Sequence, residues 1–381
     1  MATQLQPTFA ISASLEQDES LIWKEDASFK RVPYAASIQL PSPFPADTEF
    51  PLAVSPTVAN VPLSKFVASI RRFSSSGSIR RLLNAHGAIY FKDLHLKSSD
   101  EFSQFAHAFG WPAHEDIGNP VRRTIHGPNV ATANEGPNTQ PVYPHNEFGL
   151  SPHYPQYVFF FCMSAPETGG ETPINHSVVL YERLKEREPS FIEALEQKGV
   201  KYQLFYPNRP RDDVSSPGTS VLQSYGIRVL DTDTVDEARE KVETEIRRLP
   251  TVSWGWENQS ETNLLGDLRV WQTLPALRRH EQSGNIAFFN NAVSRYLNAK
   301  GRGTLRAPHI DNKGAYSPPC FYGDGELIPD RFLETAVEII DEIKAKVTWQ
   351  TGDVLLIDNH QVQHAREPWT GNRKLLASLW D

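Results

Sequence analysis

Residues 145–174 read HNEFGLSPHYPQYVFFFCMSAPETGGETPI, and the fold and function of the chain are inferred outward from this stretch. Its centre, residues 157–163, is a short, continuous apolar run that begins after Pro155, which is typical of a buried strand. Ahead of it, His145 and Glu147 stand two residues apart. Because residues i and i+2 of a strand point to the same face, this spacing offers an imidazole and a carboxylate to one metal ion.

Further strands are expected at residues 87–94, 345–349, 354–357 and 375–380. Helical spacing and capping signals predict helices over residues 63–83, 98–108, 177–199 and 234–249. Strands so far apart in the sequence, joined by Gly, Pro and Asp turns, suit a jelly-roll barrel better than a doubly wound sheet. We therefore expect a mainly β fold with flanking helices and a double-stranded β-helix (jelly-roll) core.

The third metal ligand is sought in residues 352–376, which read GDVLLIDNHQVQHAREPWTGNRKLL. An apolar strand in this segment delivers either His360 or His364 near its far end. Arg373 follows on the neighbouring final strand, where a guanidinium can hold a dicarboxylate through two parallel hydrogen bonds. Two histidines and one carboxylate form a facial triad that leaves three coordination positions open for oxidant and substrate.

Two other segments also place a carboxylate two residues after a histidine: HED at residues 114–116 and HID at residues 309–311. Both lie among turn residues and lack the alternation of a strand. The pair His145 and Glu147 is instead followed by a strand and by a GGET turn that presents the hydroxyl of Thr172. We favour this pair and keep residues 309–311 as the main alternative.

Three segments of the chain together resemble the taurine dioxygenase (TauD/TfdA) superfamily of Fe(II)- and 2-oxoglutarate-dependent dioxygenases. Residues 145–174 resemble its HNE…GGET-P segment, and residues 358–376 its DN…HGR-x-PF-x-G-x-R segment. Residues 280–291, HEQSGNIAFFNN, are similar to a segment of its SyrP-like branch of amino-acid hydroxylases. The resemblance extends in order over residues 50–381, which favours a single domain.

The resemblance implies roles for individual residues. The iron ligands would be His145, Glu147 and His364, because the family's distal histidine stands five residues after the Asn of the DN pair. The family's 2-oxoglutarate arginine falls on Arg373 and its threonine on Thr172, with O2 as the second co-substrate. Ala365 replaces the usual Gly after the distal histidine, which narrows the expected substrate cavity.

The implied reaction oxidises an unactivated C–H bond of a small amino acid or related carboxylate, in specialised metabolism. Hydroxylation, desaturation and oxidative cyclisation all remain open, as do a sulfonate, an aryloxy acid or a larger secondary metabolite as substrate. Candidate substrate contacts are Asn134, Asn290 or its neighbour Asn291, and Arg366, which shares a strand face with His364. Radical halogenation is disfavoured because Glu147 fills the position it needs, and a metal-free binding barrel would be expected to have lost a ligand.

The composition and charge of the chain limit its possible partners and location. A net charge of -8 and a pI near 5.9 argue against a nucleic-acid or anionic-membrane partner. Two cysteines are too few for a disulfide framework, and the N-terminus lacks the pattern of a signal peptide, so a cytoplasmic location is expected. Residues 1–60 are predicted to be a Pro-rich arm that either wraps the domain or serves a homo-oligomer. Residues 61–381 then form one dioxygenase domain, with a lid insertion over residues 202–285.

Overall fold

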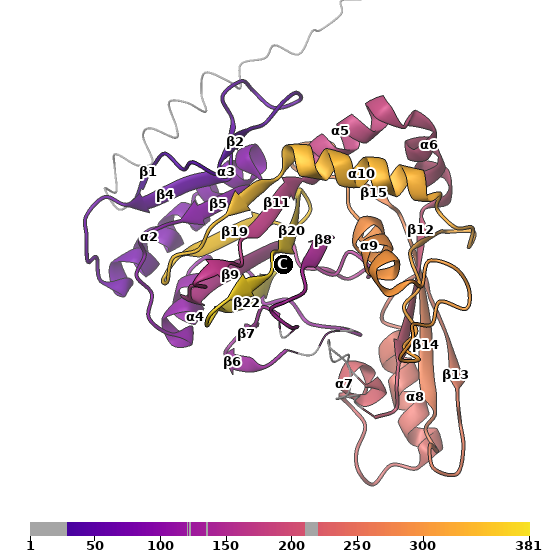
Figure 1. Ribbon diagram of the computed structural model, residues 1–381. Helices are drawn as coiled ribbons and strands as arrows, with labels where there is room; N and C mark the ends of the chain where they lie inside the picture. Colours follow the sequence, from indigo (N-terminus) through magenta and orange to yellow (C-terminus); the bar gives the residue numbers. More distant parts are fainter. Residues whose placement is uncertain (1–28, 120, 122, 135, 210–219) are drawn as a thin grey trace, which may run out of the picture.

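Two β-sheets packed against each other form the core (Figure 1). The structure is a computed structural model that describes residues 29–381, apart from 120, 122, 135 and 210–219. The larger sheet has the order β1 (Phe29–Arg31), β4 (Leu52–Pro56), β5 (Ala88–Phe91), β19 (Val354–Asp358), β9 (Tyr157–Ser164), β22 (Lys374–Trp380), β7 (Val130–Thr132) and β6 (Ile125–Gly127). The smaller sheet has the order β18 (Ala345–Val347), β11 (Thr172–His176), β20 (Val362–Arg366) and β8 (Val142–His145).

Eight of these strands, followed along the chain, are divided equally between the two sheets. Strands β7, β9, β19 and β22 lie in the larger sheet, and β8, β11, β18 and β20 in the smaller. All their pairings are antiparallel. Apolar side chains of both sheets, including Phe160, Ile357, Ile174 and Val362, meet in one buried cluster. The predicted double-stranded β-helix is therefore confirmed.

Part of the segment predicted as an N-terminal arm belongs to the larger sheet. Strand β4 pairs in parallel with β5 and antiparallel with β1, and Phe29, Leu52 and Val54 are buried. Pro51 precedes β4 and Pro56 is its last residue, so neither proline stands in the interior of the strand. A short hairpin of β2 (Ile38–Gln39) and β3 (Glu49–Phe50) lies between them. Residues 1–28 of the predicted arm lie outside the described residues.

Helices cover the outer faces of both sheets (Figure 1). Against the larger sheet pack α2 (Leu63–Ser75), α3 (Ser78–His86) and α4 (Ser99–His107). Over the smaller sheet lie α5 (Ser177–Arg187), α6 (Pro189–Lys198), α9 (Ala292–Arg302) and α10 (Asp330–Ile343). The single helix predicted over residues 63–83 is two helices, because Gly77 lies between them with a left-handed φ of 74°.

The predicted lid region forms a smaller unit with its own apolar cluster. It contains β12 (Val200–Tyr206), α7 (Val221–Tyr225), α8 (Val235–Ile246), β13 (Val252–Glu257) and β14 (Asp267–Leu274), and its sheet is completed by β17 (Phe321–Tyr322). Tyr206, Tyr225 and Ile246 are buried between this sheet and its helices. Figure 1 shows the unit extending away from the jelly roll. Its action as a lid stays a prediction.

Two further strand pairs lie outside these sheets. Strand β10 (Thr168–Gly169) pairs with β21 (Trp369–Thr370), and β15 (Leu277–Arg279) pairs with β16 (Ile286–Phe288). The first pair brings the GGET turn against the segment that precedes Arg373. The predicted GGET turn and the predicted final strand are thus neighbours in space.

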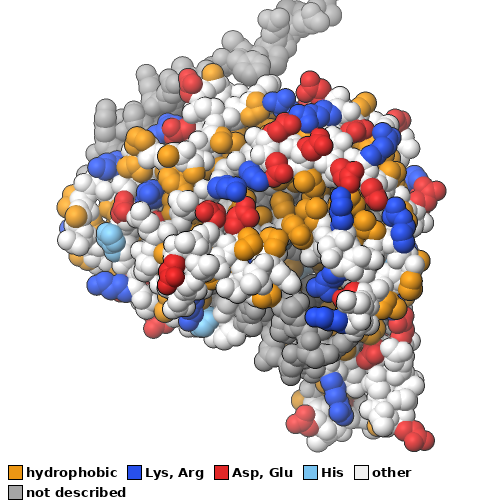
Figure 2. Space-filling model, in the orientation of Figure 1, with side chains coloured by type: hydrophobic (Ala, Val, Ile, Leu, Met, Phe, Trp, Pro, Cys, Tyr) orange, Lys and Arg blue, Asp and Glu red, His pale blue; other side chains and the backbone are white. Residues whose placement is uncertain are grey.

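The surface shows acidic and basic side chains side by side. On the face seen in Figure 2, Lys and Arg are interspersed with Asp and Glu instead of forming a patch of one sign. Within residues 29–381, leaving aside the gaps given above, no helix is both long and apolar enough to cross a bilayer.

Candidate metal centre

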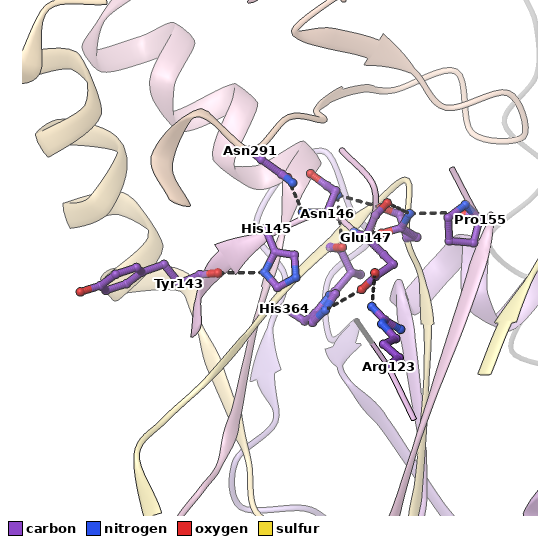
Figure 3. A network of polar contacts seen from close by, with 10 residues as sticks. Arg123, Tyr143, His145, Asn146, Glu147, Pro155, Asn291 and His364 are labelled. Atoms are coloured by element: carbon purple, nitrogen blue, oxygen red, sulfur yellow. Dashed lines mark hydrogen bonds and ion pairs between the residues drawn. The ribbon is translucent and has the colours of Figure 1, made fainter. Parts of the chain in front are cut away.

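His145, Glu147 and His364 converge at one end of the smaller sheet (Figure 3). His145 is the last residue of β8, and His364 stands directly opposite it on β20. Glu147 lies past the strand, in the turn that follows, so its carboxylate turns back toward the two rings. One nitrogen or oxygen atom from each of the three lies within 4.8 Å of the others. Among the described residues, no other group of His, Cys, Asp or Glu is arranged in this way.

Asn359 fixes the backbone of Glu147. Its Oδ1 accepts a hydrogen bond from the Glu147 N–H at 2.7 Å, and its Nδ2 donates to the Glu147 carbonyl at 2.9 Å. The same Nδ2 also donates to the carbonyl of Pro155 at 2.8 Å. Asn359 is fully buried in the turn between β19 and β20. The distal part of the chain therefore holds the carboxylate ligand as well as providing His364.

Asn146 links the same turn to two other segments. Its N–H donates to Oδ1 of Asn291 at 3.0 Å, and its Nδ2 donates to the carbonyl of Asn359 at 2.8 Å. Gly149 is required nearby, because a Cβ there would come within 2.5 Å of Asn291 Oδ1. Buried amides that satisfy one another in this way specify one geometry for the turn.

The electrostatics of the three side chains suit metal binding. Burial, together with repulsion from His364, lowers the pKa of His145 to about 4, so its imidazole is neutral at pH 7. Its Nδ1 lies 2.9 Å from the Tyr143 carbonyl, which favours a proton on Nδ1 and leaves Nε2 for a metal. Burial, the largest single effect, would raise the pKa of Glu147, but Arg123, His364 and His145 together outweigh it and hold that pKa below its usual range. The result is an ionised carboxylate beside the neutral ring of His145.

The two carboxylate oxygens of Glu147 face different partners. Oε2 lies 3.4 Å from Nε2 of His364, and Oε1 accepts a hydrogen bond from Arg123 at 2.5 Å. Two imidazole nitrogens and one carboxylate oxygen are the donor set of a facial triad, and Fe(II) is the ion that this set commonly holds with open positions. The residues present therefore fit a mononuclear iron site.

A cavity of about 160 Å³ opens beside the triad. Its lining is mostly apolar and includes Val142, Phe148, Phe160 and Leu375. Several of the residues predicted from the sequence also line it: Asn134, Thr172, Arg366 and Arg373. The fold thus gathers residues from Asn119 to Leu375 around one space.

Arg373 and Thr172 lie close to each other in this lining. Arg373 Nε donates to the carbonyl of Gly170 at 2.9 Å, and burial, with a smaller effect of Arg366, lowers the pKa of Arg373 to about 10. A Cβ at Gly170 would come within 2.8 Å of the Arg373 side chain, so glycine is needed for this approach. The hydroxyl of Thr172 accepts from Trp349 Nε1 at 2.9 Å.

A comparison with known proteins gives the family. Residues 51–380 match the model of the taurine catabolism dioxygenase TauD, TfdA family. This chain belongs to that family. It is therefore an Fe(II)-dependent oxygenase that uses 2-oxoglutarate and O2, as the resemblance implied.

Individual relatives of this TauD/TfdA protein cover nearly the whole chain. A clavaminate synthase-like protein of Arabidopsis thaliana is 30% identical over 87% of this chain and 93% of its own length. The dapdiamide synthesis protein DdaC of Enterobacter agglomerans is 26% identical over 86% of this chain and 92% of its own. Among solved structures, a taurine dioxygenase from Burkholderia xenovorans covers 93% of this chain and is itself covered over 90%, with 15% identity and a TM-score of 0.44.

The alternative metal pairs have other partners in this TauD/TfdA protein. His309 Nδ1 lies 2.8 Å from the Thr304 carbonyl, and Asp311 forms an ion pair with Arg302 at 3.6 Å. His114 Nδ1 contacts Asp381 at 2.7 Å. Neither pair approaches the group formed by His145, Glu147 and His364.

The candidate substrate residues divide into two groups. Asn134 and Arg366 both line the cavity and hydrogen-bond to each other. Asn290 is not in the lining: its Nδ2 donates to the Ala276 carbonyl at 3.0 Å and its Oδ1 accepts from the Ala292 N–H at 2.9 Å. Its neighbour Asn291 does line the cavity.

Two residues that contact Glu147 were missed by sequence reasoning. Arg123 lies in a segment with no periodic signal, and only the fold brings it to Glu147. Asn359 was quoted in the DN pair, but its role as a clamp on Glu147 was not predicted. The adjacency of Asn359 to the β19 strand end was the available signal, because polar residues at such ends often serve a site.

Replacing Asn359 by Ala is expected to lower the free energy of unfolding by about 2–4 kcal/mol, because buried backbone groups of Glu147 and Pro155 lose their partners. Metal affinity should fall by about 10- to 100-fold, as is usual when a residue that orients a ligand is removed. Urea unfolding and Mn(II) titration would measure the two effects. Asn312→Ala, at an exposed position, is the matched control. Unchanged metal affinity in Asn359→Ala would show that Asn359 supports only the fold.

Proposed function

We propose that this oxygenase oxidises an unactivated C–H bond of a small amino acid or related carboxylate. In the proposal His145, Glu147 and His364 hold Fe(II), while Arg373 and Thr172 hold the far carboxylate of 2-oxoglutarate. Bound iron supplies the activation of O2, and the protein supplies position, charge and shelter from water.

The charge of the cavity is the observation that carries the substrate class. Among the described residues in its lining, Arg123, Arg366 and Arg373 are opposed by the single carboxylate of Glu147. Fe(II) would add two further positive charges. A 2-oxoglutarate dianion leaves this excess partly uncompensated, so a second anion is favoured over a neutral molecule.

The relatives support the biological setting. One is named as a protein of dapdiamide synthesis and another as clavaminate synthase-like, and the first name points to specialised metabolism. Sulfonates and aryloxy acids are also anions, and they remain the alternative substrates. The site does not favour hydroxylation, desaturation or cyclisation over one another.

Free amino acids are expected to accelerate 2-oxoglutarate decarboxylation by the iron-loaded protein, with product and succinate formed one to one. Screening amino acids, sulfonates and aryloxy acids for stimulated succinate release would identify the substrate class. Omission of iron should abolish the stimulation in every case. A neutral ester or terpenoid accepted in preference to every anion would contradict the proposed substrate class and leave the oxygenase assignment intact.

A further inference from the structure

We infer that Arg123 binds a carboxylate of the substrate and is the residue that makes the cavity selective for acids. The inference rests on the proposed function, because it assumes a substrate oxidised beside the triad. Three described arginines line the cavity, and the structure gives each of them a different set of partners.

Both terminal nitrogens of Arg366 donate to the protein itself, and only its buried Nε has no hydrogen-bond partner among the described residues. Its NH1 donates to Asn134 Oδ1, and its NH2 donates to the carbonyls of Pro137 at 2.9 Å and Gln140 at 2.7 Å. Its guanidinium also stacks over Trp369 at 4.5 Å. Arg366 therefore holds Asn134, Pro137 and Gln140 in place, and a substrate carboxylate would have to displace several of these bonds.

Arg373 is placed for the co-substrate. Its Nε is held by Gly170, and it adjoins the GGET turn that ends in Thr172. The terminal nitrogens of the guanidinium remain available to one carboxylate. If 2-oxoglutarate takes this position, Arg373 has no further pair of donors for a second anion.

Arg123 has donor capacity left over. Its side chain is only 12% exposed, and its one ion pair with a described residue is that of NH2 with Glu147 Oε1. Like that of Arg366, its buried Nε has no hydrogen-bond partner among the described residues, but only one of its two terminal nitrogens, NH2, donates to a described side chain. A buried donor without an acceptor is unfavourable, and an anionic ligand in the cavity would supply the acceptor.

The position of Arg123 suits a residue that contacts a ligand entering the cavity. It lines the cavity beside the triad and also a neighbouring cavity of about 480 Å³, and Asn119 and Val121 line both as well. Phe148 and Leu150, which lie in the same lining, are apolar. A ligand with one carboxylate at Arg123 and an apolar portion toward the triad matches this arrangement.

Binding without turnover tests the inference. Wild-type protein and Arg123→Gln would be loaded with Mn(II) and 2-oxoglutarate without O2, and titrated by calorimetry with free L-amino acids and with the methyl ester of each. In the wild type, at least one acid should bind more tightly than its ester by about 30-fold or more, which is the effect of truncating one partner of a buried charge pair. Arg123→Gln should lose this preference while its affinity for 2-oxoglutarate changes by less than about threefold.

Two further variants make the result specific. Arg123→Lys keeps the charge but not the planar fork, so it should recover part of the preference for the acid. Arg306→Gln removes an exposed arginine that pairs with Asp330 and should bind as the wild type does.

Equal binding of acids by wild type and Arg123→Gln would overturn the inference and leave the proposed function standing. Equal binding of esters and acids, or no binding of any acid, would overturn it together with the proposed substrate class. A loss of 2-oxoglutarate affinity in Arg123→Gln would instead assign Arg123 to the co-substrate. Because the measurement needs no turnover, a failure of the oxidation itself would be seen separately, in the succinate assay.

Discussion

Replacing Glu147 by Gln is expected to reduce iron-dependent succinate formation to background. The amide has the shape of the carboxylate but no charge, so the buried site loses its only anionic donor to the metal. A buried charge without a partner is unfavourable. Glu147→Ala would leave the buried Arg123 without its ion pair, at a cost of about 3–5 kcal/mol in stability. Iron content after purification and cobalt absorption spectra would show the loss of the site directly. His145→Ala and His364→Ala should give the same result.

Asp311→Ala is the matched control for this experiment. It removes a carboxylate that also stands two residues after a histidine, but one that pairs with Arg302 away from the triad. Its activity and iron content should stay close to those of the wild type. Full activity in Glu147→Gln, or activity lost only in Asp311→Ala, would contradict the assignment of the iron ligands.

Replacing Arg373 by Ala should raise the 2-oxoglutarate concentration needed for half-maximal rate on the order of 30-fold to several thousandfold. The estimate corresponds to the roughly 2–5 kcal/mol lost when a buried, hydrogen-bonded charge pair is truncated. Iron content should be nearly unchanged, because the side chain contacts Gly170 and none of the three ligands. Titration of 2-oxoglutarate in the succinate assay, alongside metal analysis, would measure both quantities.

Arg373→Lys should fall between wild type and Arg373→Ala, since an ammonium keeps the charge and cannot form two parallel hydrogen bonds to a carboxylate. An unchanged 2-oxoglutarate requirement in Arg373→Ala would show that another cation holds the co-substrate. Arg366 is the nearest candidate, because both guanidinium groups lie against the ring of Trp369.

The sequence predicted the jelly roll because its strands have strong local signals. Residues 157–163 are continuously apolar, and the observed strand β9 differs from that range by a single residue at its end. The distal segment was predicted as one strand carrying His360 or His364 and is in fact two, with a turn at Asn359. Burial did not separate them, because both strands are continuously buried; the polar residues 358–361, DNHQ, were the available signal of the turn.

The spacing of His145 and Glu147 predicted that the two side chains converge. They do converge, but by a different geometry from the one expected. The two were expected on one face of a strand, whereas β8 ends at His145 and Glu147 reaches back from a turn. That turn is held by Asn359, 212 residues away, and its carboxylate by Arg123. Contacts over such separations have no local signature, which is why both residues escaped sequence reasoning. Asn290 and Asn291 show the same limit, since adjacent residues at a strand end face opposite ways.

The strand order of the larger sheet has a consequence for how the chain acquires its structure during translation. Strand β9 has β19 on one side and β22 on the other, and these begin at Val354 and Lys374, long after β9 ends at Ser164. Until they emerge, both edges of β9 are open, a state prone to intermolecular pairing. The barrel can therefore close only after β19 and β22 have been synthesised. We expect the yield of the protein in cells to depend on protection of β9 during synthesis.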